Sequence, residues 1–197
     1  MPASQTPQTY TFNARPFSSG QVFTLRPDGL SIAQGPRERL LAFREMSEIR
    51  LHYTPQNFNS GACTATIASG WRRVAISSVS WRGLTQQVSD NQGYTNFVRA
   101  LVSQAARANP AVRLVAGMGR LRFWLMLPAS IGIGAFLGWF LLRAVAAGYW
   151  LAALMVAALI AYFLWWTSGF LNRNRPGIFT PDTLPPAVMP DLPDHQG

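Results

Sequence analysis

Short apolar runs alternate with turn sequences over residues 10–78. Pro27-Asp28-Gly29 and Ser69-Gly70 are turn signals between runs rich in β-branched and aromatic residues. Within one run, Ile49 and Leu51 alternate with polar residues, as in a strand with one buried face. The pattern predicts half-buried antiparallel strands at 10–15, 22–26, 30–33, 39–43, 49–53, 62–68 and 71–78.

The period then changes from two to that of a helix. Asp90 and Asn91 are both good N-caps, and Asn109-Pro110 is a pair that ends helices. Between them, apolar residues recur at spacings of three and four. They are Tyr94, Phe97, Val98, Leu101 and Ala105. We therefore expect one amphipathic helix to close the β domain.

Two uncharged stretches follow, at 123–142 and 144–171. A helix of twenty residues spans about 30 Å, the hydrocarbon thickness of a bilayer. The second stretch is longer than a span needs, so we expect a turn at 146–149 with Gly148 as the breaker. Aromatic residues stand where the interfaces should be. They are Phe123, Trp124, Tyr149, Trp150, Trp165 and Trp166. The pattern predicts a transmembrane helical hairpin rather than a buried soluble one.

Charge sets the expected orientation. The chain carries a net charge of +9, has no lysine, and places 14 of its 17 arginines before residue 123. Five arginines flank the outer ends of the two spans, whereas only Arg143 lies near the turn. The five are Arg113, Arg120, Arg122, Arg173 and Arg175. The positive-inside rule then puts both termini in the cytoplasm. The polar N-terminus argues against a cleaved signal peptide.

Three segments carry a resemblance to a known family. They are the hairpin FTLRPDGLSIA, the run LLAFREMSEIRLHY and the helix YTNFVRALVSQAARANP. Over residues 23–110 they resemble a bacterial pleckstrin-homology-like (PH-like) domain. With the tail NRNRPGIFTPDTLPPAVMPDLP, the whole chain resembles small proteobacterial membrane proteins in which such a domain precedes two spans.

The resemblance implies an α+β membrane protein of the bacterial inner membrane. It consists of a PH-like antiparallel β barrel or sandwich capped by a C-terminal helix, followed by a two-helix transmembrane hairpin. The expected divisions are a cytoplasmic domain at 1–110, a juxtamembrane linker at 111–122, the hairpin at 123–171 and a proline-rich tail at 172–197. Eukaryotic PH-like domains often bind inositol phospholipids through basic residues at the first hairpin, where this chain has only Arg26 beside Asp28.

Catalytic or metal-binding patterns are not recognisable in the sequence. His52 is expected at a strand surface, and Cys63, which alternates with Ala65, as a small buried residue. Glu45 and Glu48 fit local ion pairing better than acid–base chemistry. We expect no cofactor, no metal and no enzymatic activity, with an enzyme of lipid or envelope metabolism as a remote alternative.

Arginine interleaved with tryptophan is the strongest functional signal. If the runs around residues 71 and 81 pair, they form a basic aromatic patch that could contact anionic lipid headgroups at the membrane surface. The candidate lipid-binding residues are Trp71, Arg72, Arg73, Trp81, Arg82, Arg113, Arg120 and Arg122. The alternative is that one tryptophan fills the core and the arginines are solvated. Nucleic acid is not expected as a partner, because no recognition element accompanies the charge.

Small residues give the first span a face for close helix packing, at Gly134 and Gly138. They could pack on the second span, which has an alanine face, or on the helices of another protein or a second copy. The tail contains six prolines and can lie along its own domain, dock on a partner, or stay disordered. We expect an accessory or scaffold subunit of a larger membrane complex, for example an energy-converting one, with membrane lipids and other membrane subunits as partners. The alternative is a membrane-surface lipid sensor that uses the Trp and Arg patch.

Overall fold

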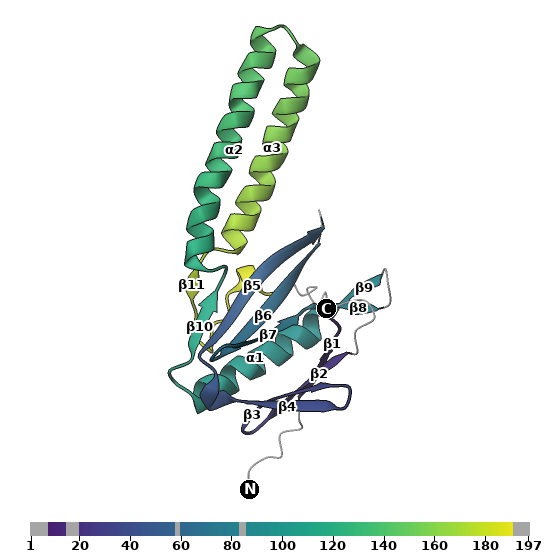
Figure 1. The fold of residues 1–197 in the computed structure, drawn as a ribbon, viewed down its shortest axis with the longest axis vertical. Helices are drawn as coiled ribbons and strands as arrows, with labels where there is room; N and C mark the ends of the chain where they lie inside the picture. Colours follow the sequence, from purple (N-terminus) through teal and green to yellow (C-terminus); the bar gives the residue numbers. More distant parts are fainter. Residues whose placement is uncertain (1–7, 15–19, 58–59, 83–85, 191–197) are drawn as a thin grey trace, which may run out of the picture. The chain divides into compact units, whose positions relative to one another are not determined.

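The computed structural model describes residues 8–14, 20–57, 60–82 and 86–190, and the chain divides into two compact units (Figure 1). One unit combines Met1–Gly117 with Gly177–Gly197, and the other is Met118–Pro176. The described residues form an α+β fold, with mainly antiparallel sheets and three α-helices. Arg15 and residues 191–197, which the sequence analysis included in a strand and in the tail, lie outside the described residues.

The first sheet of the β unit is a four-stranded antiparallel meander in the order β1-β2-β3-β4. Its strands are β1 (Thr9–Phe12), β2 (Gln21–Arg26), β3 (Gly29–Gln34) and β4 (Arg37–Ala42). Tight turns join the last three strands, and the one between β2 and β3 lies at Pro27-Asp28, where the sequence predicts a turn. A short 3₁₀ helix, η1 (Phe43–Glu45), leads out of β4 toward the second sheet.

The second sheet has five strands in the order β11-β10-β5-β6-β7. They are β5 (Glu48–Asn57), β6 (Ser60–Ser69), β7 (Arg72–Ser77), β10 (Arg113–Ala116) and β11 (Gly177–Ile178). Gly70, with a φ of 57°, makes the turn between β6 and β7. A separate hairpin pairs β8 (Val79–Arg82) with β9 (Gln86–Ser89).

Every predicted strand is present, but β8 to β11 were not predicted. The strand β10 lies within residues 111–122, which the sequence analysis treated as a linker, and it pairs with β5 in parallel. The predicted strands pair antiparallel with one another, as expected, and the parallel pair involves a strand that was not predicted.

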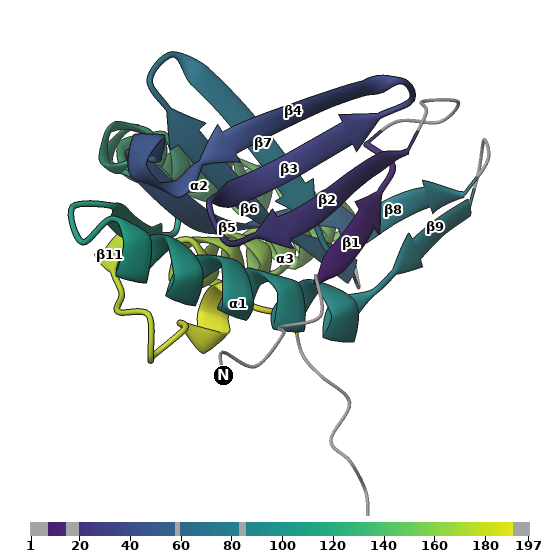
Figure 2. The same cartoon turned by 90° about the horizontal axis from the view of Figure 1, so that it is seen from below.

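The helix α1 (Asn91–Ala108) packs its apolar face against both sheets (Figure 2). Asp90 is its N-cap, with its carboxylate accepting from the Gly93 N–H at 2.8 Å. All five apolar residues predicted for the buried face are buried. Among the described residues the two sheets do not close on each other, so the expected PH-like barrel is not confirmed.

The C-terminal tail is part of the β unit. Phe179, Val188 and Met189 are buried in the same hydrophobic core as the strands and α1. The Phe179 N–H donates to the Leu114 carbonyl at 3.2 Å, and η2 (Pro186–Val188) follows. Three alternatives were open for the tail: contact with its own domain, docking on a partner, or disorder. Residues 177–190 lie along their own domain.

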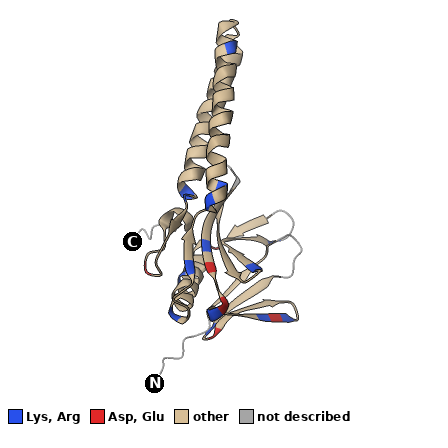
Figure 3. Cartoon of the chain, turned by 60° about the vertical axis from the view of Figure 1, so that its left-hand side comes forward, with Lys and Arg blue, Asp and Glu red and all other residues tan. Residues whose placement is uncertain are grey.

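The second unit is an antiparallel helical hairpin of α2 (Arg120–Ala146) and α3 (Trp150–Arg173). Both helices are long and apolar enough to cross a membrane, with lengths of about 40 and 36 Å at 1.5 Å per residue. Gly148, with a φ of 76°, lies in the turn where the sequence placed the breaker. The Met118 N–H donates to the Asn174 carbonyl at 3.0 Å, which joins the two open ends. Figure 3 shows that charge is confined to positions near the ends of the hairpin.

Candidate ligand-binding groove

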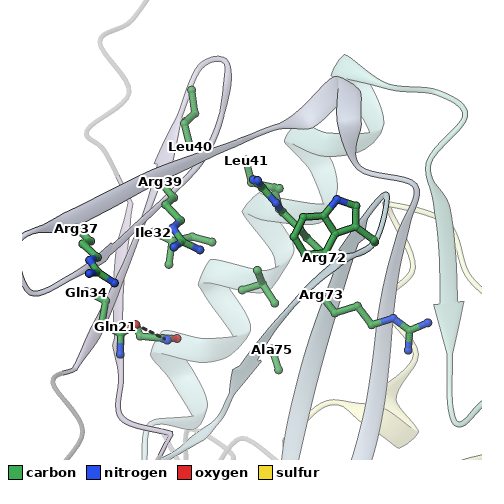
Figure 4. Close-up of a pocket in the computed structure, with 12 residues that line it drawn as sticks. Gln21, Ile32, Gln34, Arg37, Arg39, Leu40, Leu41, Arg72, Arg73 and Ala75 are labelled. Carbon is green, nitrogen blue, oxygen red and sulfur yellow. Dashed lines mark hydrogen bonds between the residues drawn. The ribbon is translucent and has the colours of Figure 1, made fainter.

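A groove of about 940 Å³ lies between β4 and β7, the edge strands of the two sheets (Figure 4). It takes one side from β2, β3 and β4 and the other from the β6–β7 turn and β7. The lining residues are Gln21, Ile32, Gln34, Arg37, Arg39, Leu40, Leu41, Trp71, Arg72, Arg73, Val74 and Ala75.

Strand alternation explains why arginines reach this groove. On β4, Leu41 is buried in the core, and Arg39 and Arg37 continue the same row because alternate residues share a face. On β7, the row runs from buried Ile76 to exposed Arg72. Each row is apolar in the core and becomes cationic where it leaves the core. The groove therefore lies where the core-facing rows of β4 and β7 change from apolar residues to arginines.

The edge of β7 itself borders the groove. Residues 71–75 line it consecutively, although successive side chains of a strand point to opposite faces. Only a surface that runs along the edge of the strand can contact both sets. Residues 39–41 of β4 also line the groove consecutively, so the edge of β4 borders it on the other side. Neither edge is paired with a further strand among the described residues.

The electrostatic character of the groove is uniformly positive. Its lining contains four arginines and no acidic residue. The nearby Glu38 lies on the other face of β4, where its Oε1 accepts from Arg26 at 2.5 Å and from the Ser31 hydroxyl at 2.6 Å. These contacts occupy Glu38 on that face. The groove arginines can therefore offer charge-assisted hydrogen bonds to an anionic ligand.

Trp71 is the tryptophan of the groove lining. Its side chain is 87% exposed, and the Arg72 guanidinium lies 5.2 Å from the centre of its ring. This distance is that of a cation–π contact. Leu40, 45% exposed, is the apolar residue at the rim on the β4 side. The groove thus combines cationic groups with exposed apolar surface.

The structure divides the predicted Trp and Arg patch. Trp71, Arg72 and Arg73 line the groove, but Trp81 and Arg82 belong to β8. The condition that the two runs pair is not met, because β7 pairs with β6 and β8 pairs with β9. A bend at Ser78 separates the two runs, and Ser78 bonds back to Cys63.

The remaining predicted lipid-binding residues are not part of the groove. Arg113 begins β10, where its Nη1 lies 3.9 Å from Glu48 Oε2. Arg120 and Arg122 form the first turn of α2, in the other unit. Glu48 also accepts from Arg50 at 2.8 Å, so the expectation of local ion pairing there is confirmed.

Arg37, Arg39 and Leu40 were missed by the sequence analysis. A signal was available, because Arg37 and Arg39 are two residues apart and therefore share one strand face. The sequence does not show that this face of β4 lies on the opposite side of a groove from β7.

Gly134 and Gly138 do not bring α2 and α3 into close contact. Both are partly buried, yet a methyl group added at either would meet no atom within 4 Å. The first account of this small-residue face was close packing of α2 on α3 within the hairpin. No such close contact is present at Gly134 or Gly138. The second account, packing against a partner's helices, stays a prediction.

The other candidate residues do not form a reactive cluster. Cys63 is buried, as predicted, beside the buried Ala65. Among the described residues, no group of three or more His, Cys, Asp or Glu side chains could hold a metal ion. The groove is therefore the candidate site with the clearest chemistry. Comparison with protein-family models, with curated proteins and with solved structures gives no match to this chain.

Proposed function

We propose that this protein is a noncatalytic accessory or scaffold subunit of a larger membrane complex, with a PH-like β domain as its contact surface. The groove between β4 and β7 carries this proposal, because it gathers four arginines, exposed Trp71 and Leu40 on two strand edges that pair with no further strand in the described part of the chain. Aromatic residues and arginine are enriched at protein interfaces. The hairpin supplies the membrane anchor.

The chain topology supports one location for the whole β unit. The strands β10 and β11 pair with each other and immediately precede and follow the hairpin. If the hairpin spans a bilayer, both strands must lie on the same side. The arginines outside its open end favour the cytoplasmic side, and hence cytoplasmic termini, in the inner membrane of a bacterium.

Purification from the native membrane in a mild detergent tests this function. We expect the tagged wild-type protein to carry a stoichiometric set of membrane subunits, and the variant Arg39→Gln/Arg72→Gln to lose them. Arg82→Gln removes an exposed arginine outside the groove and serves as the matched control. Subunits that stay bound to the double variant, or a wild-type protein that purifies alone, would contradict the proposal.

A second candidate is a membrane-surface sensor of anionic lipid, and the Trp71–Arg72 pair favours it. A tryptophan exposed beside a cation suits the headgroup region of a bilayer. The test uses the full chain in nanodiscs of neutral lipid, mixed with vesicles that contain phosphatidylglycerol. Lipid sensing requires salt-sensitive binding that Trp71→Ala weakens. Binding that is unchanged in Trp71→Ala would exclude this pair as the sensor.

A further inference from the structure

We propose that the groove binds an extended acidic peptide, which adds as a strand to the free edge of β7. This inference rests on the proposed function and specifies the partner's chemistry: a segment with both carboxylate and apolar side chains. It differs from headgroup binding because the main chain of the ligand would contribute to recognition.

The edge of β7 is the first observation. Residues 71–75 line the groove in succession, so the main chain between them borders it. A strand edge without a partner presents N–H and C=O groups that an extended peptide can pair with. Among the described residues, β6 is the strand paired with β7, and it occupies the opposite edge.

The separation of the lining into an apolar part and a cationic part is the second observation. The apolar residues Ile32, Leu41 and Val74 lie toward the core, and the arginines lie where the rows leave it. An added strand projects side chains alternately to its two faces. Apolar side chains of an added strand can contact the apolar part, and carboxylates can reach the arginines.

Charge complementarity is the third observation. Arg37 and Arg39 lie on the groove side of β4 and Arg72 on that of β7, whereas Arg73 points away from β4 (Figure 4), and the lining contains no acidic residue. A ligand between the two strands therefore meets cations on both sides. A carboxylate bound by a guanidinium forms a charge-assisted and often bidentate hydrogen bond.

The form of the groove favours a peptide over a lipid headgroup. A headgroup needs a compact cluster of donors, whereas these arginines are distributed over two strands with apolar residues between them. An extended peptide uses both sets of residues and the free strand edge. Arginines on edge strands can also serve to prevent aggregation, and that role requires no ligand.

The test measures peptide affinity for the full-length protein in neutral detergent at low salt. The probe is a fluorescent peptide of alternating glutamate and valine, read by anisotropy. One comparison peptide has proline in place of valine, which keeps the charge but removes alternate N–H donors. A second comparison peptide has lysine in place of glutamate. We expect the proline peptide to bind at least about tenfold more weakly and the lysine peptide not to bind.

Groove variants locate the binding. We expect Arg39→Gln and Arg72→Gln each to weaken the glutamate–valine peptide about tenfold, and Arg82→Gln to leave its affinity unchanged. Equal affinity for the proline peptide would overturn strand addition, since charge alone would then explain the binding. Failure of the acidic peptide to bind would overturn the proposal as well, and binding of anionic vesicles in its place would assign the groove to lipid.

The outcomes separate this inference from the proposed function. If Arg39→Gln/Arg72→Gln loses its native subunits while strand addition fails, the scaffold function stands and the partner's chemistry is wrong. If the acidic peptide binds as a strand but the native subunits stay on the double variant, the groove is a peptide site without a role in assembly.

Discussion

Val115 pairs with Ile178 in adjacent antiparallel strands, although the whole helical hairpin lies between them in the chain. The hairpin is therefore an insertion between neighbouring strands of one sheet. The residues after it complete the β unit, because Phe179, Val188 and Met189 are part of its core. A fragment that ends at residue 110 would lack β10, β11 and these three side chains.

The tail should consequently matter for the stability of the β unit. We expect Phe179→Ala to lower its free energy of unfolding by about 3 kcal/mol, since it removes a buried aromatic side chain. Ile178→Ala is the matched control, because that neighbouring side chain is 85% exposed. Denaturant titration in detergent, followed by proteolysis, measures both. Equal stability of the two variants would show that the tail does not contribute to the core.

Two buried tyrosines should respond differently to loss of their hydroxyl groups. The Tyr10 hydroxyl donates to the Ser77 carbonyl at 2.8 Å and links β1 to β7, whereas the Tyr94 hydroxyl has no hydrogen-bond partner among the described residues. We expect Tyr10→Phe to cost about 1 kcal/mol of stability and Tyr94→Phe to be neutral or stabilising. The same denaturant titration compares them. A larger loss for Tyr94→Phe would contradict this assignment.

Both tyrosines should also make the β unit sensitive to alkali. Burial raises the pKa of each above its ordinary value of 10.0, helped by Asp90 at Tyr10 and by Cys63 at Tyr94. Above about pH 10 the unfolded chain loses these protons and the folded chain keeps them, so stability falls as pH rises. Below about pH 10 both tyrosines are protonated in the folded and the unfolded chain, so their contribution to stability is fully present.

The pH dependence can be measured by denaturation at a series of alkaline pH values. The variant Tyr10→Phe/Tyr94→Phe should lose less stability between neutral pH and pH 11 than the wild type. Tyr149→Phe is the control, because that side chain is exposed. Identical pH profiles for the wild type and the double variant would refute the link to the buried tyrosines.

The glycines of α2 should tolerate a methyl group. Nothing lies within 4 Å of an added Cβ at Gly134 or Gly138, so alanine should leave the hairpin folded, with a gain of a few tenths to 1 kcal/mol from helix propensity. If these glycines pack against a partner or a second copy, Gly134→Leu should reduce the native mass in mild detergent. A native mass that stays constant in Gly134→Leu would remove the intermolecular role. Unfolding of Gly134→Ala would show that the hairpin itself needs the glycine.

Local periodicity accounts for the elements that the sequence predicted. Alternation around Ile49 and Leu51 and the spacing of Tyr94, Phe97 and Leu101 each follow from one buried face. The strand β10 was missed because its four residues lie close before an apolar span and its partner β5 is distant in the chain.

The groove required information that local patterns do not contain. The sequence indicates that Arg37 and Arg39 share a face and that Trp71 and Arg72 are neighbours. It does not indicate that β4 and β7 are both edge strands, or that they border one groove. The predicted pairing of the runs around Trp71 and Trp81 failed for the same reason, because the partner of a strand depends on the whole topology.

The groove between β4 and β7 is proposed to bind an acidic partner. Amide hydrogen exchange of the full-length protein, with and without the glutamate–valine peptide, tests it most directly. The account predicts slower exchange in β7 (Arg72–Ser77) when the peptide is bound, and no change in β8 (Val79–Arg82). Unaltered exchange in β7 at a saturating concentration of peptide would contradict it.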